Sequence, residues 1–68
     1  MTNTSALRDA IERRGVKYGH IAKEMGLSPY GLQRKIENDN EFKVSEVCRL
    51  SDILGLDPSE RDSIFFAK

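Results

Sequence analysis

Residues 18–37 have the sequence YGHIAKEMGLSPYGLQRKIE, which contains the strongest structural signal of the chain. Its first part, to about Met25, has apolar side chains spaced as on one face of an α-helix. Gly26 follows as a residue that tolerates the left-handed conformation in which many helices end. Ser28 is a good N-cap, and Pro29 fits the first helical position because no amide hydrogen is needed there. These residues predict two short helices joined by a three-residue turn.

Two short helices joined by a tight turn that contains glycine are the helix-turn-helix unit. Ala22 is small where the two helices are expected to cross closely. The second helix has a narrow apolar stripe, Leu32 and Ile36, which we expect to face the core. Its other side is broad and polar, and it consists of Pro29, Tyr30, Gln33, Arg34 and Glu37. We therefore expect this helix to pack on the core through a narrow apolar stripe and to present a broad polar face to a binding partner.

Three further helices are expected around this unit. The first covers about residues 5–14, the fourth about residues 44–54, and the last begins at Pro58. No segment alternates with a period of two for long enough to suggest a strand. The predicted fold class is all-α, with five short helices in one compact domain over residues 1–68.

Length and composition exclude several classes of protein. Sixty-eight residues form a single domain with a small core. One cysteine, Cys48, and one histidine, His20, are too few for a disulfide or a structural zinc site, so we expect no metal and no cofactor. We expect Cys48 to be a buried small apolar residue and His20 to lie on the surface. The lack of a signal peptide and of a long apolar run predicts a cytoplasmic protein without membrane association.

The formal charge sums to zero but is unevenly distributed. Residues 1–37 carry seven Lys or Arg and four Asp or Glu, a net charge of +3. Residues 38–68 carry four Lys or Arg and seven Asp or Glu, a net charge of −3. DNA-binding domains are usually basic, so the total charge weakens a DNA-binding hypothesis while the basic first half supports it.

Residues 21–28, IAKEMGLS, with Leu32 four residues further on, resemble the helix-turn-helix of the Cro and phage-repressor family. Later runs resemble the small prophage members of that family: residues 35–36, 41–42, 45–47 and 50–56. The resemblance covers nearly the whole chain and implies a lambda-repressor-like DNA-binding fold. It also implies a Cro-like homodimer that binds a palindromic operator in double-stranded DNA and regulates transcription, most simply by occluding a promoter.

The resemblance implies a set of DNA contacts when it is carried over residue by residue. These contacts fall on Tyr18, Ser28, Pro29, Tyr30, Gly31, Gln33, Arg34, Asn38, Asn40 and Lys43. In the family, the first of these positions contacts a phosphate, and the next four lie where the recognition helix enters the major groove. The two positions one turn later read bases, and the last three contact the DNA backbone.

Several of these residues allow more than one interpretation. Pro29 stands where the family often has a polar base-reading residue. Arg34 either reads a guanine, whose two acceptors match its planar fork, or is a solvated surface residue. Tyr30 contacts a thymine methyl group or a phosphate, and Lys35 lies at the edge of both faces of the helix. Glu37 accepts from a cytosine amino group, pairs with Arg34, or is turned away.

The end of the chain provides the expected dimer interface. Ile64, Phe65 and Phe66 are consecutive apolar residues, and three neighbours span about 200° of a helix circumference. One domain core is therefore not expected to bury all three. We expect one of the two phenylalanines to fill the core and the other to contact a second subunit.

A second class of function is a helix-turn-helix scaffold that binds another protein, as an antirepressor or an antitoxin does. The zero net charge is its best support. An enzyme is not expected, because no nucleophile, base and orienting group form a familiar motif. The chain is also too short to enclose a pocket of about 300 Å³ easily, so we expect no small-molecule substrate.

Overall fold

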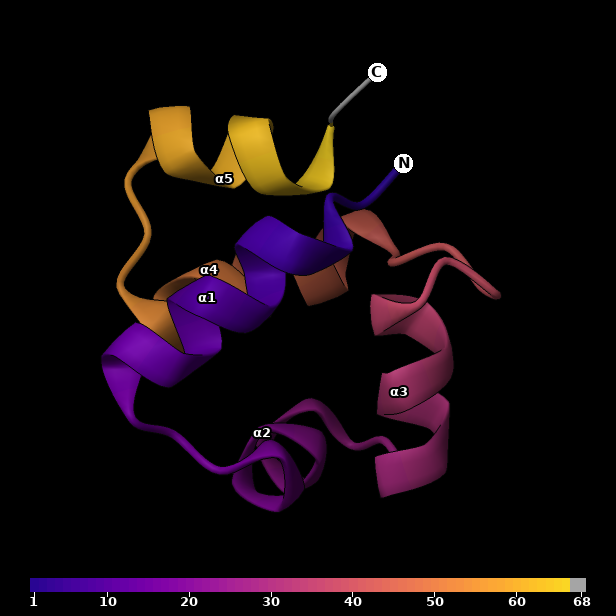
Figure 1. The fold of residues 1–68 in the computed structure, drawn as a ribbon. Coiled ribbons are helices and arrows are strands. Elements are labelled where there is room, and N and C mark those ends of the chain that lie inside the picture. The colour runs from indigo at the N-terminus through magenta and orange to yellow at the C-terminus, as the bar shows by residue number, and fades with distance from the viewer. Residues whose placement is uncertain (67–68) are drawn as a thin grey trace.

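The computed structural model describes residues 1–66, and within this range it contains five α-helices and no strand (Figure 1). The helices are α1 (Thr4–Arg14), α2 (Tyr18–Met25), α3 (Pro29–Ile36), α4 (Val44–Leu54) and α5 (Pro58–Phe65). The predicted all-α fold class is therefore confirmed. Within residues 1–66, no helix is long and apolar enough to span a membrane.

The helices pack around a central pair formed by α1 and α4. Helix α5 packs on both members of this pair, and α2 packs on α4 and on α3 (Figure 1). One cluster of buried apolar side chains draws on all five helices, and its largest fully buried members are Leu7, Ile11, Ile21, Leu32, Ile36 and Leu50. Helix α3 contributes only Leu32 and Ile36, as its narrow stripe predicted.

The prediction that Cys48 is buried is wrong, because its side chain is exposed. The buried residues of α4 include Val47, Leu50 and Leu54, which recur at the three-and-four spacing of one helix face. Cys48 is one position beyond Val47, so it lies about 100° around the helix from that residue. It follows the exposed Val44 by one turn and belongs to the outer face.

Three residues join α2 to α3, and hydrogen bonds close both sides of this connection. Gly26 has a φ of 69°, and the N–H of Leu27 donates to the carbonyl of Ala22 at 2.8 Å. This is the six-to-one bond of a Schellman C-cap, which requires a left-handed residue at the position of Gly26. On the other side, Ser28 Oγ accepts from the N–H of Gly31 at 3.0 Å. The direction of α3 relative to α2 is thus set by local backbone bonds.

Helix α3 ends in a second Schellman motif, whose left-handed residue is Asn38, with a φ of 67°. Asparagine is one of the few residues that adopt this conformation readily. Its side chain also reaches the start of the chain: Oδ1 accepts from the N–H of Thr2 at 2.9 Å, and Nδ2 donates to the Thr2 carbonyl at 2.8 Å. Thr4 Oγ1 donates to the carbonyl of Ile36 at 2.6 Å. The N-terminal segment thereby holds the end of α3.

We expect Asn38→Ala to lower the free energy of unfolding by about 2–3 kcal/mol, because it removes the Thr2 hydrogen bonds and strains a left-handed backbone. Asn38→Gly loses the same bonds but tolerates the backbone, so its loss should be smaller by about 1 kcal/mol. Urea denaturation of the two variants measures both values. Equal losses for alanine and glycine would show that backbone conformation is unimportant at this position.

Candidate functional site

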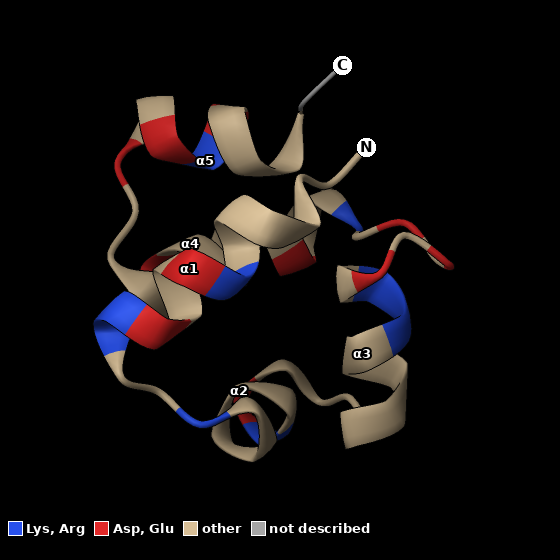
Figure 2. Ribbon diagram, in the orientation of Figure 1, with Lys and Arg blue, Asp and Glu red and all other residues tan. Residues whose placement is uncertain are grey.

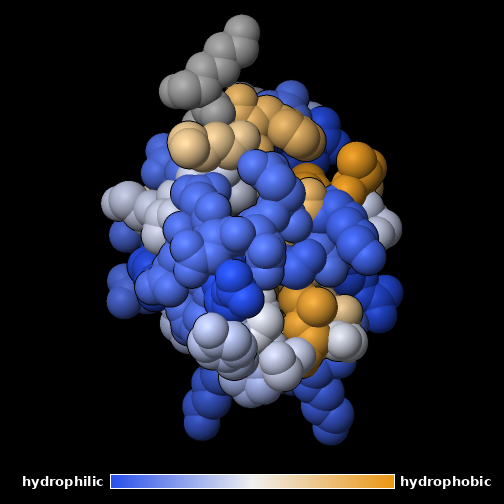
Figure 3. Space-filling model, turned by 90° about the vertical axis from the view of Figure 1, so that its right-hand side faces the viewer, coloured by the Kyte–Doolittle hydropathy of each residue, from blue (hydrophilic) through white to orange (hydrophobic). Residues whose placement is uncertain are grey.

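The outer face of α3 is a polar surface that does not pack on the core. Tyr30 is 72% exposed, and Ser28 and Pro29 are exposed at the start of the helix, while Gln33 and Arg34 are partly exposed one turn later. Figure 3 looks at this side of the molecule and shows that it is hydrophilic over most of its area. The face continues into residues 37–43, the connection between α3 and α4.

Arg34 lies over the ring of Tyr30, with 5.9 Å between the guanidinium carbon and the ring centroid. The two residues are one helical turn apart, and the separation is within the range of a cation–π interaction. Among residues 1–66, no carboxylate lies within ion-pair distance of Arg34. Its hydrogen-bond donors are therefore not committed to an acidic partner.

Glu37 pairs with a residue that the sequence did not suggest. Its Oε2 lies 3.5 Å from Nη2 of Arg8 on α1, and the two side chains are 54% and 38% exposed. Exposed pairs of this kind contribute little, because water and salt screen them. The contact nevertheless directs Glu37 toward α1 and away from Arg34.

The sequence placed Lys35 at the edge between the core face and the outer face of the helix. In the structure its side chain lies toward α4. Its Nζ donates to Oε1 of Glu46 at 2.7 Å and to the carbonyl of Glu41 at 3.3 Å. The side chains of Lys35 and Glu46 are only 13% and 14% exposed. The same Oε1 accepts from the N–H of Lys43 at 2.8 Å, so Glu46 caps the first turn of α4, where Lys43 has no side-chain acceptor to offer.

Burial of the Glu46 carboxyl raises its pKa. Two other effects lower the pKa and together outweigh burial: the hydrogen bonds from Lys35 and the Lys43 N–H, and the positive charges of the two lysines. The net result is a pKa for Glu46 below its usual value. A carboxyl whose pKa is lower in the folded chain contributes stability that is fully present above its usual pKa. That contribution is lost as the pH falls through the folded-state pKa.

We therefore expect Glu46→Gln to lower the free energy of unfolding by about 1 kcal/mol at pH 7. The difference from the wild type should shrink as the pH falls through the lowered folded-state pKa of Glu46, because the wild-type carboxyl is then protonated too. Thermal unfolding at several pH values measures this difference. Glu12→Gln, on the exposed side of α1, is the control and should show no such convergence. A constant gap between Glu46→Gln and the wild type would contradict the ion pair.

The remaining candidate DNA contacts do not all face solvent. Asn40 and Lys43 are exposed in the α3–α4 connection, while Tyr18, at the first position of α2, is partly buried against the core. Asn38 is exposed in the same connection, but its side-chain amide bonds to Thr2 and Thr4. Gly31 also has a local reason to lack a side chain, because a Cβ there would lie 3.2 Å from Ser28 Oγ.

The three expected interface residues at the end of α5 divide as the helix geometry requires. Phe65 is buried, and its ring packs edge-on against Phe42 with centroids 5.4 Å apart. Ile64 is buried as well, whereas Phe66 is 54% exposed. The expectation that one phenylalanine fills the core and the other stays outside is confirmed. Ile64 and Phe65 are not available to a partner, because α5 uses them to pack on the rest of the domain.

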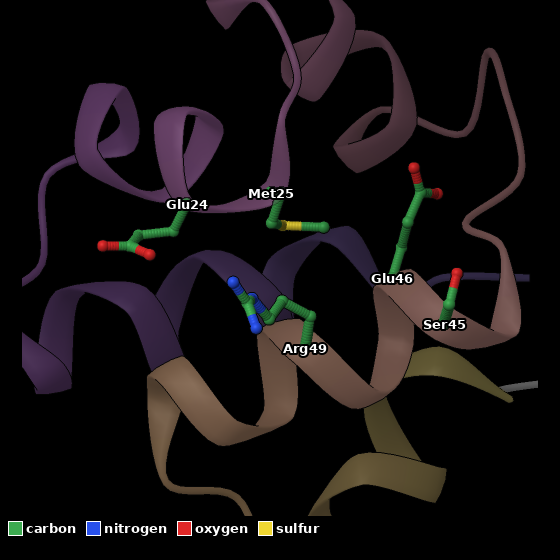
Figure 4. A pocket seen from close by; sticks show the side chains of 5 residues that line it. All are labelled: Glu24, Met25, Ser45, Glu46 and Arg49. Carbon is green, nitrogen blue, oxygen red and sulfur yellow. The ribbon is translucent and has the colours of Figure 1, made fainter.

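The surface away from the outer face of α3 also has open grooves. A groove of about 240 Å³ lies between α2 and α4, where Glu24 and Met25 face three residues of α4, namely Ser45, Glu46 and Arg49 (Figure 4). Within residues 1–66, no group of three His, Cys, Asp or Glu side chains is placed to hold a metal ion.

Comparison of the chain with models of known protein families and with curated proteins gave no match.

Proposed function

We propose that the protein binds double-stranded DNA in a sequence-specific manner, with α2, residues 26–28 and α3 acting as a helix-turn-helix. The observation that carries this proposal is the outer face of α3, where Ser28, Pro29 and Tyr30 are exposed while Leu32 and Ile36 hold the helix on the core. The major groove of DNA admits one α-helix, and a recognition helix needs a long polar face combined with a thin apolar anchor. The short, capped connection supports the proposal, because it holds α3 in a set direction.

Arg34 and Gln33 are the proposed base readers. Arg34 has no acidic partner among residues 1–66, and its stacking on Tyr30 limits the directions that the guanidinium can take. A guanidinium fork matches the two major-groove acceptors of guanine. The N-terminal end of α3 would enter the groove first, and it exposes Ser28, Pro29 and Tyr30.

Phosphate contacts are assigned to the exposed Asn40 and Lys43 and to Tyr18. Such contacts position a protein on DNA but do not specify sequence. Asn38 is left out of this set, because its amide is used within the domain.

The proposed active species is a homodimer that represses transcription by occluding a promoter. One recognition helix reads only a few base pairs, and two copies related by a two-fold axis read two half-sites about 34–36 Å apart. Phe66 is the proposed contact, since an exposed phenylalanine on a small domain often marks an interface.

Binding of a labelled random-sequence duplex at low salt tests the proposal, because a DNA-binding face must attract phosphates whatever the sequence.

We expect Lys43→Gln to weaken binding to random and selected duplexes alike, and to reduce the slope of log affinity against log salt by about one unit. Fluorescence anisotropy across a salt series gives both values. A loss confined to one sequence would assign Lys43 to base reading.

A second candidate function is protein binding by the same scaffold, as an antirepressor or antitoxin. Acidic residues favour it: Glu37, Asp39 and Glu41 lie beside the basic last turn of α3 (Figure 2). They reduce the attraction of this surface for phosphates. Failure to bind random duplexes even at low salt would favour this function over DNA binding.

A further inference from the structure

The last turn of α3 carries two cations that have different surroundings. Arg34 lies on the outer face over Tyr30, whereas Lys35 is turned toward α4 and is mostly covered. Lys35 Nζ touches the connection at the Glu41 carbonyl and α4 at Glu46 Oε1, which in turn holds the N–H of Lys43. One pair of side chains therefore joins α3, the α3–α4 connection and α4.

We propose that Lys35 and Glu46 are positioning residues that hold the phosphate-contacting connection in a set register to the base-reading face of α3. This inference depends on the proposed DNA-binding function. Lys35 itself contacts no DNA, and it acts through the placement of Arg34 on one side and of Asn40 and Lys43 on the other.

Two features of the fold give such a tie a role. Helix α3 is anchored by two buried apolar side chains and, at its end, by Thr2 and Thr4, and Lys35 adds a contact on the side of α4. Residues 37–43 form no helix, and they must span the distance from α3 to α4. An ion pair with little exposure is screened less by water than an exposed pair such as Arg8–Glu37.

The positioning role and a direct phosphate contact make different predictions for Lys35→Met, which removes the charge but keeps an unbranched apolar chain. Under the positioning role, the ratio of affinities for a selected duplex and a random duplex falls about tenfold, because a displaced Arg34 loses part of a base contact. Random-duplex affinity falls less and the salt slope stays close to the wild type, because Asn40 and Lys43 are displaced but both are retained.

The experiment compares the wild type with Lys35→Met, Glu46→Gln and the control Arg14→Met, whose side chain is exposed at the far end of α1. Circular dichroism first defines a temperature at which all four are fully folded. Anisotropy titrations then use a duplex enriched by the wild type from a random pool and a random duplex of the same length. Glu46→Gln keeps an acceptor for the Lys43 N–H. The ratio of selected-duplex to random-duplex affinity should therefore fall less for Glu46→Gln than for Lys35→Met.

Amide NMR spectra of the free proteins provide a readout that does not depend on DNA. We expect Lys35→Met to shift the amide signals of residues 38–43 and Arg14→Met to leave them in place. An unchanged affinity ratio for Lys35→Met, or a parallel loss on both duplexes with a lower salt slope, would overturn the positioning role. Failure of the wild type to enrich any duplex would overturn DNA binding and the inference with it, even if the amide shifts occur.

Discussion

Arg34→Ala is expected to lose about 1–3 kcal/mol of affinity for the selected duplex and to relax preference at one base pair. The reason is that Arg34 has no acidic partner among residues 1–66 and lies on the face of α3 that turns away from the core. Titrations against duplexes that carry each of the four base pairs at that position measure both effects.

Arg34→Lys separates the charge of Arg34 from its shape. Lysine keeps the positive charge but lacks the planar fork, so base preference should fall while random-duplex affinity is retained. Arg14→Ala is the matched control, since it removes one exposed arginine from the end of α1 that lies away from α3. If Arg34→Ala bound selected and random duplexes with an unchanged ratio, Arg34 would not read a base.

Phe66→Glu should reduce affinity for the selected duplex by about 100-fold or more while the monomer stays folded. Joining two binding modules in one complex raises the overall affinity by about 10²–10⁴-fold, and a monomer loses this gain. The domain tolerates the change because Phe66 is 54% exposed, whereas the neighbouring Phe65 lies in the core. Gel-shift titration and circular dichroism measure affinity and folding.

Two other variants at the end of α5 complete this test. Phe66→Leu keeps an apolar side chain and should retain most of the affinity. Phe65→Glu places a charge in the core and should unfold the domain, so it shows what a folding defect looks like beside the folded Phe66→Glu. Sedimentation that finds one subunit per duplex at saturation would contradict the dimer.

The fold could be predicted where the signal is local. Ser28 and Pro29 begin α3, Gly26 ends α2, and Leu32 with Ile36 face the core, because capping and helical spacing depend only on neighbours a few residues away. The burial of Cys48 was predicted wrongly, because the prediction relied on the small apolar side chain of cysteine and not on its position along the helix. Cys48 follows the exposed Val44 by one turn and shares its outer face.

The contacts that escaped prediction join residues distant in the sequence. Asn38 binds Thr2 across 36 residues, and the N–H of Asn3 donates to the carbonyl of Ile64 at 2.6 Å. No spacing rule connects such positions, so the sequence assigned Asn38 only the DNA-backbone contact that the family resemblance implies. The Lys35–Glu46 pair was also missed, although Glu46 stands three residues after the cap position Lys43, and this capping-box register would have identified the carboxylate.

Selection of bound sequences from a random pool of duplexes, with the full chain as bait, is the most informative measurement for this protein. DNA binding by two copies of α3 predicts enrichment of an imperfect palindrome whose half-site centres lie one helical turn, about 10–10.5 base pairs, or a multiple of it, apart. Recovery of a pool with no common sequence after repeated rounds would contradict sequence-specific binding and leave the face of α3 to a protein partner.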